Sequence, residues 1–294
     1  MQSDSKIYVA GHSGLVGSTI CRKLESDGYN NRITRTHKEL DLCNQADVNQ
    51  FFAETKPEYV FLAAAVVGGI HANDSQPVEF LRDNLLIQTN IIDAAYRNGA
   101  KKLAFLGSTC IYPRDCPQPI KEEYLLTGPL EETNQWYAIA KIAGIKLCQA
   151  YRKQFGFNAI SLMPTNLYGP GDNFELQSSH VLPALIRKFH EGKVNNKESV
   201  EVWGSGKPYR EFLYADDAAD ACCYLMQNYD DESIINIGTG QDISIRELAE
   251  LIKSVVGYEG NIVFNTSQPD GTPKKVTDVT KLNSHGWQSK TSLR

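Results

Sequence analysis

Four side chains near the middle of the sequence have types and spacing suited to proton transfer. Tyr137 and Lys141 stand four residues apart without an intervening proline or glycine, so a helix would place both on one face, with Cβ atoms about 5–6 Å apart. The lysine ammonium is then expected to lower the tyrosine pKa, and such a phenol donates a proton effectively to a carbonyl under reduction. Ser108 and Cys110 add a hydroxyl and a thiol. The set predicts reduction of a ketone, with a second kind of chemistry at Cys110.

The elements that must position these groups include a glycine-rich turn near the N-terminus. Residues 6–10 read as an apolar strand, residues 11–17 as GHSGLVG, and residues 18–27 as a helix. In that order, GxxGxxG allows a tight turn and lets the backbone approach a pyrophosphate at the helix N-terminus. Glycines also cluster in ordinary turns, but the flanking strand and helix favour a dinucleotide site.

The residues after the second predicted strand bear on the choice of dinucleotide. That strand ends near Ile33 and Thr34, and Arg35 follows. An acidic residue there would bond a ribose 2′-hydroxyl, whereas an arginine accommodates a 2′-phosphate. With His37 and Lys38 as further positive groups, the sequence favours NADP(H) over NAD. The alternative is that Arg35 and Lys38 are solvated surface charges.

The alternation of strands and helices predicts an α/β fold, with a Rossmann-type doubly wound parallel sheet and a smaller α/β substrate-binding domain. Strands are expected at residues 58–65, 102–107, 158–163 and 234–237, and helices at 83–98 and 135–154. The strand at 102–107 would deliver Ser108 and Cys110 at its carboxyl end, where open α/β sheets bind ligands.

A cluster of Pro, Gly and Asn at residues 164–173 interrupts this alternation and marks a change of domain. Beyond it we expect a strand at 209–213 and helices at 180–190, 217–228 and 243–256, the last behind Ser244 as N-cap. The predicted division assigns residues 1–164 and 211–238 to an NADP-binding domain. Residues 165–210 and 239–294 form the predicted substrate-binding domain.

The two predicted helices at 83–98 and 135–154 are apolar almost all round. A helix without a polar face is usually buried, and only one face of each can pack on its own sheet. We therefore expect the other faces to pair in a homodimer, with a third layer within the same chain as the alternative.

The composition is that of a globular enzyme without nucleic-acid or membrane partners. The chain has 294 residues, 41% of them hydrophobic, and a net charge of −5, which argues against nucleic acid or an anionic membrane as the main partner. The longest apolar run, residues 59–70, is too short to span a bilayer, and residues 1–10 lack the pattern of a signal peptide. Seven cysteines without a CxxC pair predict reduced thiols, no metal site and a cytoplasmic location.

Several motifs together resemble one family over nearly the whole chain. They are the GxxGxxG turn, GSTCIYP, YAIAKIAGIKLCQAY, MPTNLYGPGDNF, SHVLPALIRKFHE, WGSGKPYREFL, NIGTG and PDGTPKK. The chain is similar to the extended short-chain dehydrogenase/reductases that act on nucleotide sugars, and among them to the GDP-L-fucose synthases. The resemblance implies NADPH-dependent 3,5-epimerisation and 4-keto reduction of GDP-4-keto-6-deoxy-D-mannose, with the sugar nucleotide held by the substrate-binding domain.

The resemblance also implies roles for individual residues. The catalytic set is Ser108, Cys110, Tyr137, Lys141 and His180. The cofactor set is Gly11, His12, Ser13, Gly14, Leu15, Val16, Gly17, Arg35, His37, Lys38, Asp41, Leu42, Lys141, Pro164, Thr165, Asn166, Leu167 and His180. The substrate set is Lys188, Trp203, Arg210 and Asp270.

The implied catalytic set would carry out two reactions. The ketone at carbon 4 makes the protons on carbons 3 and 5 acidic, and inversion there needs a base on one face and an acid on the other. Cys110 and His180 would exchange these protons, and His180 would also favour the Cys110 thiolate. Tyr137 would then protonate the oxygen, Lys141 would tune it and hold the nicotinamide ribose, and Ser108 would bond the carbonyl.

The implied substrate set has chemistry that suits a nucleoside diphosphate. Arg210 and Lys188 fit a diphosphate, the first as a bidentate fork and the second as a point charge. Trp203 fits either packing against a ring of the substrate or filling the interface between domains. Asp270, in a Pro-Asp-Gly sequence, fits the role of a turn residue as well as that of a hydrogen-bond acceptor.

Related enzymes and a non-catalytic protein are the alternatives. The 4,6-dehydratases carry a glutamate where this chain has Cys110, and the UDP-galactose 4-epimerase relatives need no base there. Another nucleotide-sugar 4-ketoreductase or epimerase stays open, including one that releases GDP-D-rhamnose as a side product. A cofactor-sensing protein would typically lack Tyr137 or Lys141, and both are present.

Overall fold

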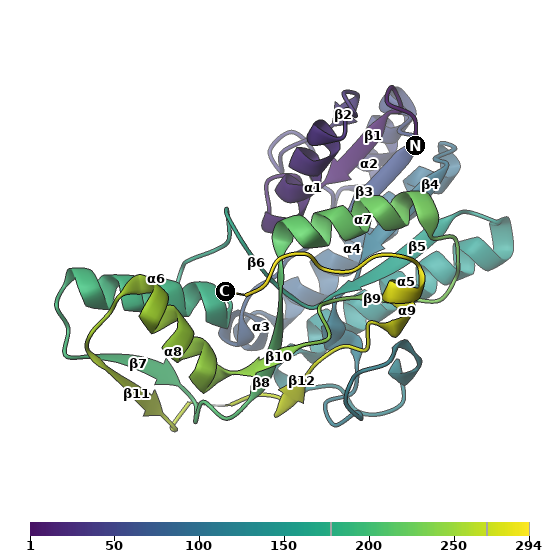
Figure 1. The fold of residues 1–294 in the computed structure, drawn as a ribbon. Coiled ribbons are helices and arrows are strands. Elements are labelled where there is room, and N and C mark those ends of the chain that lie inside the picture. Colours follow the sequence, from purple (N-terminus) through teal and green to yellow (C-terminus); the bar gives the residue numbers. More distant parts are fainter. Residues whose placement is uncertain (177, 269, 294) are drawn as a thin grey trace.

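A parallel sheet forms the larger part of the molecule. The computed structural model describes residues 1–176, 178–268 and 270–293, apart from the side chains at positions 70 and 71. These residues form a six-stranded sheet of order β2-β1-β3-β4-β5-β9, with every neighbouring pair parallel. The strands are β1 (Ile7–Ala10), β2 (Arg32–Ile33), β3 (Tyr59–Leu62), β4 (Lys102–Leu106), β5 (Ala159–Pro164) and β9 (Ile235–Ile237). The expected Rossmann-type α/β fold is confirmed (Figure 1).

Helices cover both faces of this sheet. Along β1, Ile7 and Val9 face one hydrophobic core, whereas Tyr8 and Ala10 face the other, as the two-residue period of a strand requires. The first core includes α1 (Leu15–Ser26) and α7 (Ala215–Asn228), and the second includes α2 (Gln45–Thr55), α4 (Pro77–Arg97) and α5 (Gln135–Phe155). Because both faces are covered, the strands are apolar at almost every position.

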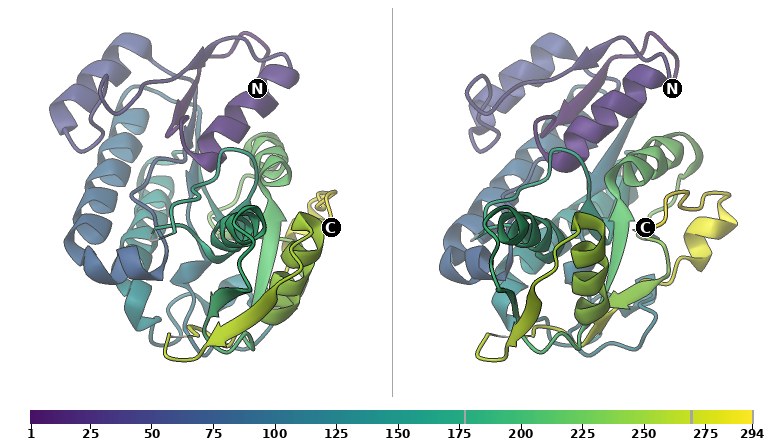
Figure 2. Two further views of the ribbon diagram at one scale, coloured as in Figure 1. Left: turned by 90° about the vertical axis from the view of Figure 1, so that its left-hand side faces the viewer. Right: turned by 60° about the vertical axis from the view of Figure 1, so that its left-hand side comes forward.

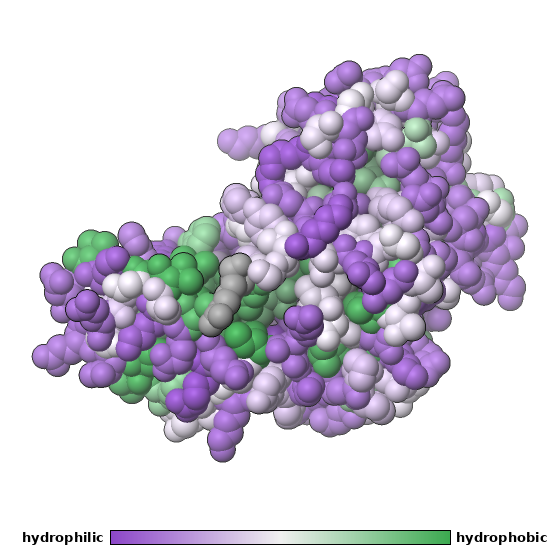
Figure 3. All heavy atoms as spheres, in the orientation of Figure 1, coloured by the Kyte–Doolittle hydropathy of each residue, from purple (hydrophilic) through white to green (hydrophobic). Residues whose placement is uncertain are grey.

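A smaller part of the molecule meets the carboxyl ends of β4, β5 and β9 (Figure 2). Its central strand, β8 (Tyr209–Tyr214), pairs antiparallel with β10 (Asp242–Ser244) and parallel with β6 (Asn166–Tyr168) and β12 (Lys274–Lys275). A second parallel pair joins β7 (Ser199–Trp203) and β11 (Asn261–Asn265). A separate core, which includes Phe189 and Leu248, holds α6 (Val181–Val194) and α8 (Ile245–Val256) together. On the face drawn in Figure 3, apolar surface gathers over this smaller part.

Local signals place the ends of several helices. Ser244 and Glu247 form a capping box, in which Ser244 Oγ accepts from the Glu247 N–H at 3.1 Å, so α8 begins at 245 rather than 243. His180 lies at the N-cap of α6 rather than inside the helix. The helix predicted from residue 83 begins at Pro77, because a proline suits the first helical position. Helix α2 was not predicted from the sequence. Its N-terminal signal is Asn44, whose side chain caps the helix by accepting from the Ala46 N–H at 3.0 Å. The remaining short helices are α3 (Ile70–Ser75), α9 (Thr280–Ser284) and the 3-10 turns Thr109–Ile111, Glu122–Tyr124 and Glu132–Asn134.

The apolar character predicted for the two long helices is only partly correct. The inner face of α4 buries Asn84, Gln88 and Asn90, and Gln88 Nε2 donates to the Ala140 carbonyl of α5 at 2.6 Å. These amides were overlooked because the surrounding apolar residues dominate the pattern. Their bonds tie α4 and α5 to each other and to neighbouring loops.

The outer faces of α4 and α5 carry apolar side chains in contact with solvent. Leu86, Trp136 and Ile139 are exposed, so no third layer of the described residues covers them. Pairing of these faces with a second copy of the chain stays a prediction. No helix of the described residues is long and apolar enough to cross a membrane.

Candidate active site

Tyr137 and Lys141 lie together on α5, as their spacing predicts. The Lys141 Nζ lies 5.5 Å from the centroid of the Tyr137 ring and donates to the Leu106 carbonyl at 2.8 Å, at the end of β4. Burial lowers the pKa of Lys141 to about 8. The pair therefore lies at the carboxyl end of β4, the strand that Ser108 and Cys110 follow.

The predicted effect of Lys141 on the Tyr137 pKa is wrong for this structure. Burial raises the Tyr137 pKa well above its ordinary value, and negative charge at Cys110 acts in the same direction. The Lys141 ammonium lies near the ring and bonds a backbone carbonyl, so it does not offset the loss of water around the hydroxyl. Tyr137 is consequently a protonated phenol throughout the neutral range, which is the form that donates.

Ser108 and Cys110 follow β4 directly. Ser108 caps the turn at Thr109–Ile111, and its Oγ accepts from the Cys110 N–H at 3.3 Å. Burial raises the pKa of the Cys110 thiol, whereas Lys275, a hydrogen bond with Ser108, and Lys141 each act to lower it. The predicted placement of both residues at the carboxyl end of a strand is confirmed.

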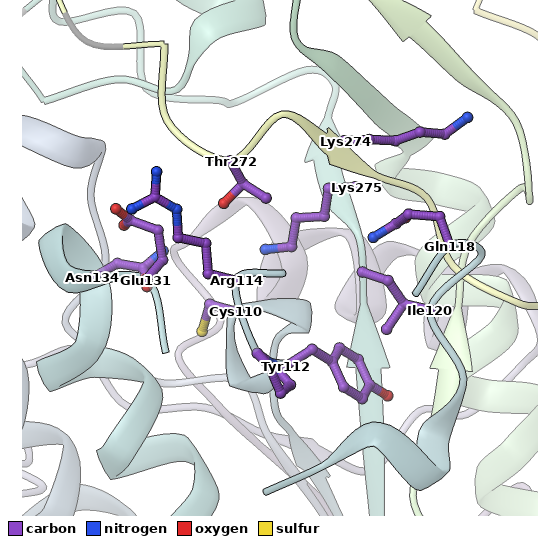
Figure 4. A pocket seen from close by; sticks show the side chains of 11 residues that line it. Cys110, Tyr112, Arg114, Gln118, Ile120, Glu131, Asn134, Thr272, Lys274 and Lys275 are labelled. Atoms are coloured by element: carbon purple, nitrogen blue, oxygen red, sulfur yellow. The ribbon is translucent and has the colours of Figure 1, made fainter. Parts of the chain in front are cut away.

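Cys110 lines a pocket to which three separated segments contribute. The segments are residues 110–120, residues 131–134 before α5, and residues 272–275. Figure 4 shows the Lys275 side chain extending from β12 toward the segment that carries Cys110. The Asn134 Oδ1 is buried and, within the described part of the chain, has no hydrogen-bond partner. The ammonium suits an anionic group of a ligand, and the unpaired amide oxygen suits a hydroxyl donor.

His180 belongs to the smaller part of the molecule, at the N-cap of α6. The residue is exposed, yet protein atoms that displace water from the imidazole lower its pKa, Asp172 acts to raise that pKa, and Lys275 acts to lower it further. The expected help of His180 toward the Cys110 thiolate is not found, since the charges that act on Cys110 are those of Lys275 and Lys141. Lys275 thus stands within electrostatic reach of both members of the predicted acid–base pair.

The glycine turn has the geometry that a dinucleotide requires. Gly11 has a φ of 83°, and a Cβ there would lie 2.7 Å from the backbone of Ala64, while a Cβ at Gly17 would collide with the Gly11 carbonyl. Gly14 is the N-cap of α1 and offers no side chain to its first N–H groups. The His12 Nδ1 is buried and unpaired among the described residues. An open helix N-terminus beside an unpaired imidazole nitrogen fits a bound pyrophosphate. The turn also contains Ser13, and α1 begins with Leu15 and Val16.

Arg35 follows β2 and packs toward α2. Its guanidinium carbon lies 5.5 Å from the centroid of the Phe51 ring. Hydrogen bonds from Thr36 lower the pKa of Glu39, and the charges of Arg35 and His12 act in the same direction. The loop after β2 therefore lies near the glycine turn, which is where the 2′-position of an adenosine ribose is expected.

The other residues predicted near the cofactor occupy the same loop. His37 Nδ1 lies 3.9 Å from Asp41 Oδ1, Lys38 is exposed, and the Leu42 carbonyl accepts from Asn90 Nδ2 at 2.9 Å. Asp41 and Leu42 thus shape the loop and join it to α4. Their contact with a cofactor stays a prediction.

Residues 164–167 lie where the chain passes from the large sheet to the small one. The Thr165 N–H donates to the Ile237 carbonyl at 3.0 Å, and Asn166 Nδ2 donates to the Glu211 carbonyl at 2.8 Å. Pro164 ends β5, and Leu167 packs partly buried against the core beneath α7. These bonds fix the junction of the two sheets.

Lys188 and Trp203 lie side by side. The Lys188 Nζ lies 5.1 Å from the Trp203 ring centroid and donates to the Glu201 carbonyl at 3.1 Å. Because Trp203 is 48% exposed, it does not fill an interface, and its ring is free to stack on a ligand. This pair fits the predicted role in substrate binding.

Arg210 of β8 lies close to Asp270. Arg210 donates to the Thr272 carbonyl at 2.6 Å and to the Asp270 carbonyl at 3.4 Å. The Asp270 carboxylate already accepts from the Ser205 N–H at 2.6 Å and from its Oγ at 2.8 Å. The turn role of Asp270 therefore has direct support, while Arg210 lies in register with Lys275 of the pocket.

Sequence reasoning missed several charged residues of the site, among them Lys275 and Asp172. Lys275 lines the pocket, and Asp172 acts on His180. Both stand inside motifs that carry the family resemblance, PDGTPKK and MPTNLYGPGDNF, and a charged residue inside such a motif is the signal that was available. Among the described residues, no group of three or more His, Cys, Asp or Glu side chains is placed to hold a metal ion.

The doubly wound sheet, the glycine turn before α1 and the Tyr137–Lys141 pair define a class of dinucleotide-dependent enzymes. Residues 7–238 match the NAD dependent epimerase/dehydratase family, and the chain belongs to that family.

Within this family, the chain is similar to several GDP-sugar enzymes along nearly its whole length. GDP-L-fucose synthase 1 of Arabidopsis thaliana is 61% identical over 290 residues, which cover 99% of this chain and 90% of the relative. A GDP-6-OMe-4-keto-L-xylo-heptose reductase from C. jejuni has a TM-score of 0.96 at 42% identity, with coverage of 100% and 95%. A GDP-L-fucose synthetase from Naegleria fowleri, solved bound to NADP, has a TM-score of 0.90 at 32% identity, with coverage of 99% and 91%.

Proposed function

We propose that this protein catalyses the NADPH-dependent 3,5-epimerisation and 4-keto reduction of GDP-4-keto-6-deoxy-D-mannose to GDP-L-fucose. The observation that carries the proposal is the arrangement of Cys110 beside the Tyr137–Lys141 pair, with Lys141 and Tyr137 each within electrostatic reach of the thiol. A plain ketone reductase needs the pair alone. The high identity to a plant GDP-L-fucose synthase supports the choice of substrate.

Inversion uses Cys110 and His180 on opposite faces of the sugar. The Cys110 thiolate accepts the proton of carbon 3 or carbon 5, and the C–H electron pair moves onto the carbonyl at carbon 4 as an enolate. His180 returns a proton to the same carbon from the other face, which inverts its configuration. Each well-placed acid or base contributes roughly 10²–10⁴ in rate.

Reduction uses the groups that surround the carbonyl oxygen. Bound NADPH supplies the hydride that reaches carbon 4. Tyr137 donates its phenol proton to the oxygen, and Ser108, whose Oγ accepts from the Cys110 N–H, donates a hydrogen bond from its hydroxyl to the same oxygen once substrate is bound. Lys141 replaces the proton on Tyr137 and holds a ribose hydroxyl.

The nucleotide parts of both ligands have separate sites. The glycine turn fits the cofactor pyrophosphate, and Arg35 supports the choice of NADP(H). We assign the substrate diphosphate to Arg210 and Lys188, with Trp203 beside Lys188. The predicted division into a cofactor domain and a nucleotide-sugar domain follows the same arrangement.

Assembly and location complete the proposal. The exposed Leu86, Trp136 and Ile139 on the outer faces of α4 and α5 support a homodimer that buries them. All seven cysteines, each within the described part of the chain, carry free thiols, which supports a reducing, cytoplasmic environment.

A 4-reductase without epimerase activity is the second candidate. It is favoured by the TM-score of 0.96 to a GDP-heptose reductase, and it would give GDP-D-rhamnose from the same substrate. The two candidates differ only in the configuration at carbons 3 and 5 of the product.

The test is NADPH oxidation with matched keto-sugars. The purified protein is given GDP-, dTDP- or UDP-linked 4-keto-6-deoxy sugars with NADPH or NADH, and the product sugar is identified. We expect turnover with the GDP substrate and NADPH, with GDP-L-fucose as product. Turnover of the dTDP or UDP substrates alone, or GDP-D-rhamnose as sole product, would contradict the proposal.

A further inference from the structure

Lys275 is a charged pocket residue to which the proposed reaction gives no role. It stands on β12, in register with Arg210 of β8, and lines the pocket together with Cys110 (Figure 4). We propose that Lys275 is the positioning residue of the acid–base pair, whose ammonium is the counter-charge of the Cys110 thiolate. This inference rests on the proposed function and adds the group that turns a buried thiol into a base.

Among the described residues, the Lys275 ammonium forms no ion pair, although the Glu131 carboxylate lines the same pocket. Its neighbour Lys274 forms an ion pair with Asp242 at 3.2 Å, whereas no carboxylate among residues 1–176, 178–268 and 270–293 forms an ion pair with Lys275. The side chain is half-buried, and a cation withdrawn from water is costly without a partner. The thiolate of Cys110 in the same lining would supply that partner.

The charges around Cys110 are consistent with this pairing. Burial dominates and raises the pKa of the thiol, and Lys275 comes first among the groups that act to lower it, before Ser108 and Lys141. Conversely, burial lowers the pKa of Lys275, and Cys110 is the foremost group that acts to raise it. Tyr137 is a further titratable group near the thiol, and burial raises its pKa, so the phenol keeps its proton at neutral pH.

The groups behind Lys275 do not replace Cys110. Arg210 acts to lower the Lys275 pKa, while Cys116 and Glu131 act to raise it but rank after Cys110. Lys275 also acts to lower the pKa of His180. The Lys275 ammonium therefore stabilises the Cys110 thiolate and makes the His180 imidazolium a stronger acid. Inversion requires a thiolate that accepts a proton and an imidazolium that donates one.

The strand that carries Lys275 is held in place by a buried carboxylate. Glu211 of β8 is fully buried, and its Oε2 accepts from the Thr277 N–H at 2.7 Å and from the Thr277 Oγ1 at 2.8 Å. Thr277 lies two residues beyond Lys275. This anchor fixes β12 beside β8, so the ammonium has a defined position relative to the pocket.

The test measures the ionisation of Cys110 without substrate. The protein is treated with iodoacetamide across pH 5–10, and alkylation of the Cys110 peptide is followed by mass spectrometry. We expect the midpoint for Lys275→Met to rise by about one pH unit, which is about a tenfold loss of alkylation rate at neutral pH. Lys275→Arg keeps the charge and should leave the midpoint near that of the original protein, and Lys275→Gln replaces the Met variant if that one unfolds.

Lys274→Met is the matched control. It removes the same charge one residue away, where the side chain points away from Cys110 in Figure 4, so the Cys110 midpoint should not move. Identical midpoints in the original protein and in Lys275→Met would overturn the inference. So would a rise in KM for the GDP sugar without a change in midpoint, which would make Lys275 a substrate ligand only.

The alkylation midpoint of Cys110 tests the role of Lys275 separately from the proposed function. The alkylation midpoint needs neither GDP sugar nor turnover, so it tests Lys275 even if the substrate proves to be another. In D₂O with the GDP sugar, Lys275→Met should also slow deuterium uptake at carbons 3 and 5 more than hydride transfer to carbon 4. Equal slowing of both reactions would contradict a role at Cys110.

Discussion

The reducing half and the inverting half of the pocket are built in different ways. Tyr137 and Lys141 stand on one helix, and the Lys141 Nζ is tied to the end of β4. Cys110, His180 and Lys275 come from the 3-10 turn after β4, from the N-cap of α6 and from β12. The reducing pair thus depends on α5, which packs against the large sheet, whereas inversion depends on how the smaller part docks against that sheet.

Tyr137→Phe should produce the largest and most selective loss. Without the phenol proton, reduction should fall by about 10²–10⁴-fold, because Ser108 alone cannot protonate the oxygen at neutral pH. Inversion should continue, which is seen as deuterium uptake from D₂O into unreduced substrate. Loss of both reactions to the same degree would show that the halves are not separable.

Cys110→Ser should reverse that selectivity. A hydroxyl is a far weaker base than a thiolate, so inversion should fall by about 100-fold or more, while NADPH oxidation persists at a lower rate. The product should then keep the configuration of the substrate at carbons 3 and 5, which NMR of the released sugar detects. Unchanged product stereochemistry would remove Cys110 from the proposed role.

Glu211→Ala should test the docking of the smaller part. The carboxylate accepts from the N–H groups of Thr239, Gly240 and Thr277, and its removal leaves buried donors unpaired. We expect the free energy of unfolding to fall by about 3 kcal/mol, measured by urea denaturation. Glu250→Ala, at an exposed position of α8, should change it by less than about 0.5 kcal/mol.

At a temperature where the Glu211→Ala variant stays folded, its rates of inversion and reduction can be compared. Inversion should suffer more than reduction, because β12 loses its anchor while α5 and β4 keep their contacts. Equal loss of both activities would mean that the small sheet supports the whole pocket.

Asp172→Asn should have the smallest effect and a defined sign. The Asp172 carboxylate acts to raise the His180 pKa against the surrounding protein, which lowers it. Without that charge the His180 pKa should fall further, and the pH above which His180 loses its proton should fall with it. NMR titration of the His180 ring protons measures the change, and an upward shift would contradict the assignment.

The reducing and inverting halves of the pocket also differ in how much of each could be predicted from the sequence. The i, i+4 spacing of Tyr137 and Lys141 is a local signal, and so is the GxxGxxG turn, so their placement was predicted correctly. The pKa of Tyr137 was not, because desolvation depends on packing by distant residues. Burial raises that pKa, whereas spacing alone suggested the reverse.

Contacts between distant segments account for the remaining gaps. Lys275 reaches Cys110 only through the pairing of β12 with β8, and no spacing in the sequence encodes that pairing. Likewise, the buried amides of α4 could not be told from surface residues until α5 was placed against them. The family resemblance supplied Cys110 and His180, but not the charge that connects them.

The central claim is that one pocket carries out both inversion and reduction. Its most direct test is the deuterium content of the product formed in D₂O. The protein, NADPH and GDP-4-keto-6-deoxy-D-mannose are combined, and the product sugar is analysed by NMR and mass spectrometry. We expect deuterium at carbons 3 and 5, with both centres inverted and carbon 4 reduced. A product reduced at carbon 4 without solvent deuterium at carbons 3 and 5 would show a plain reductase and contradict it.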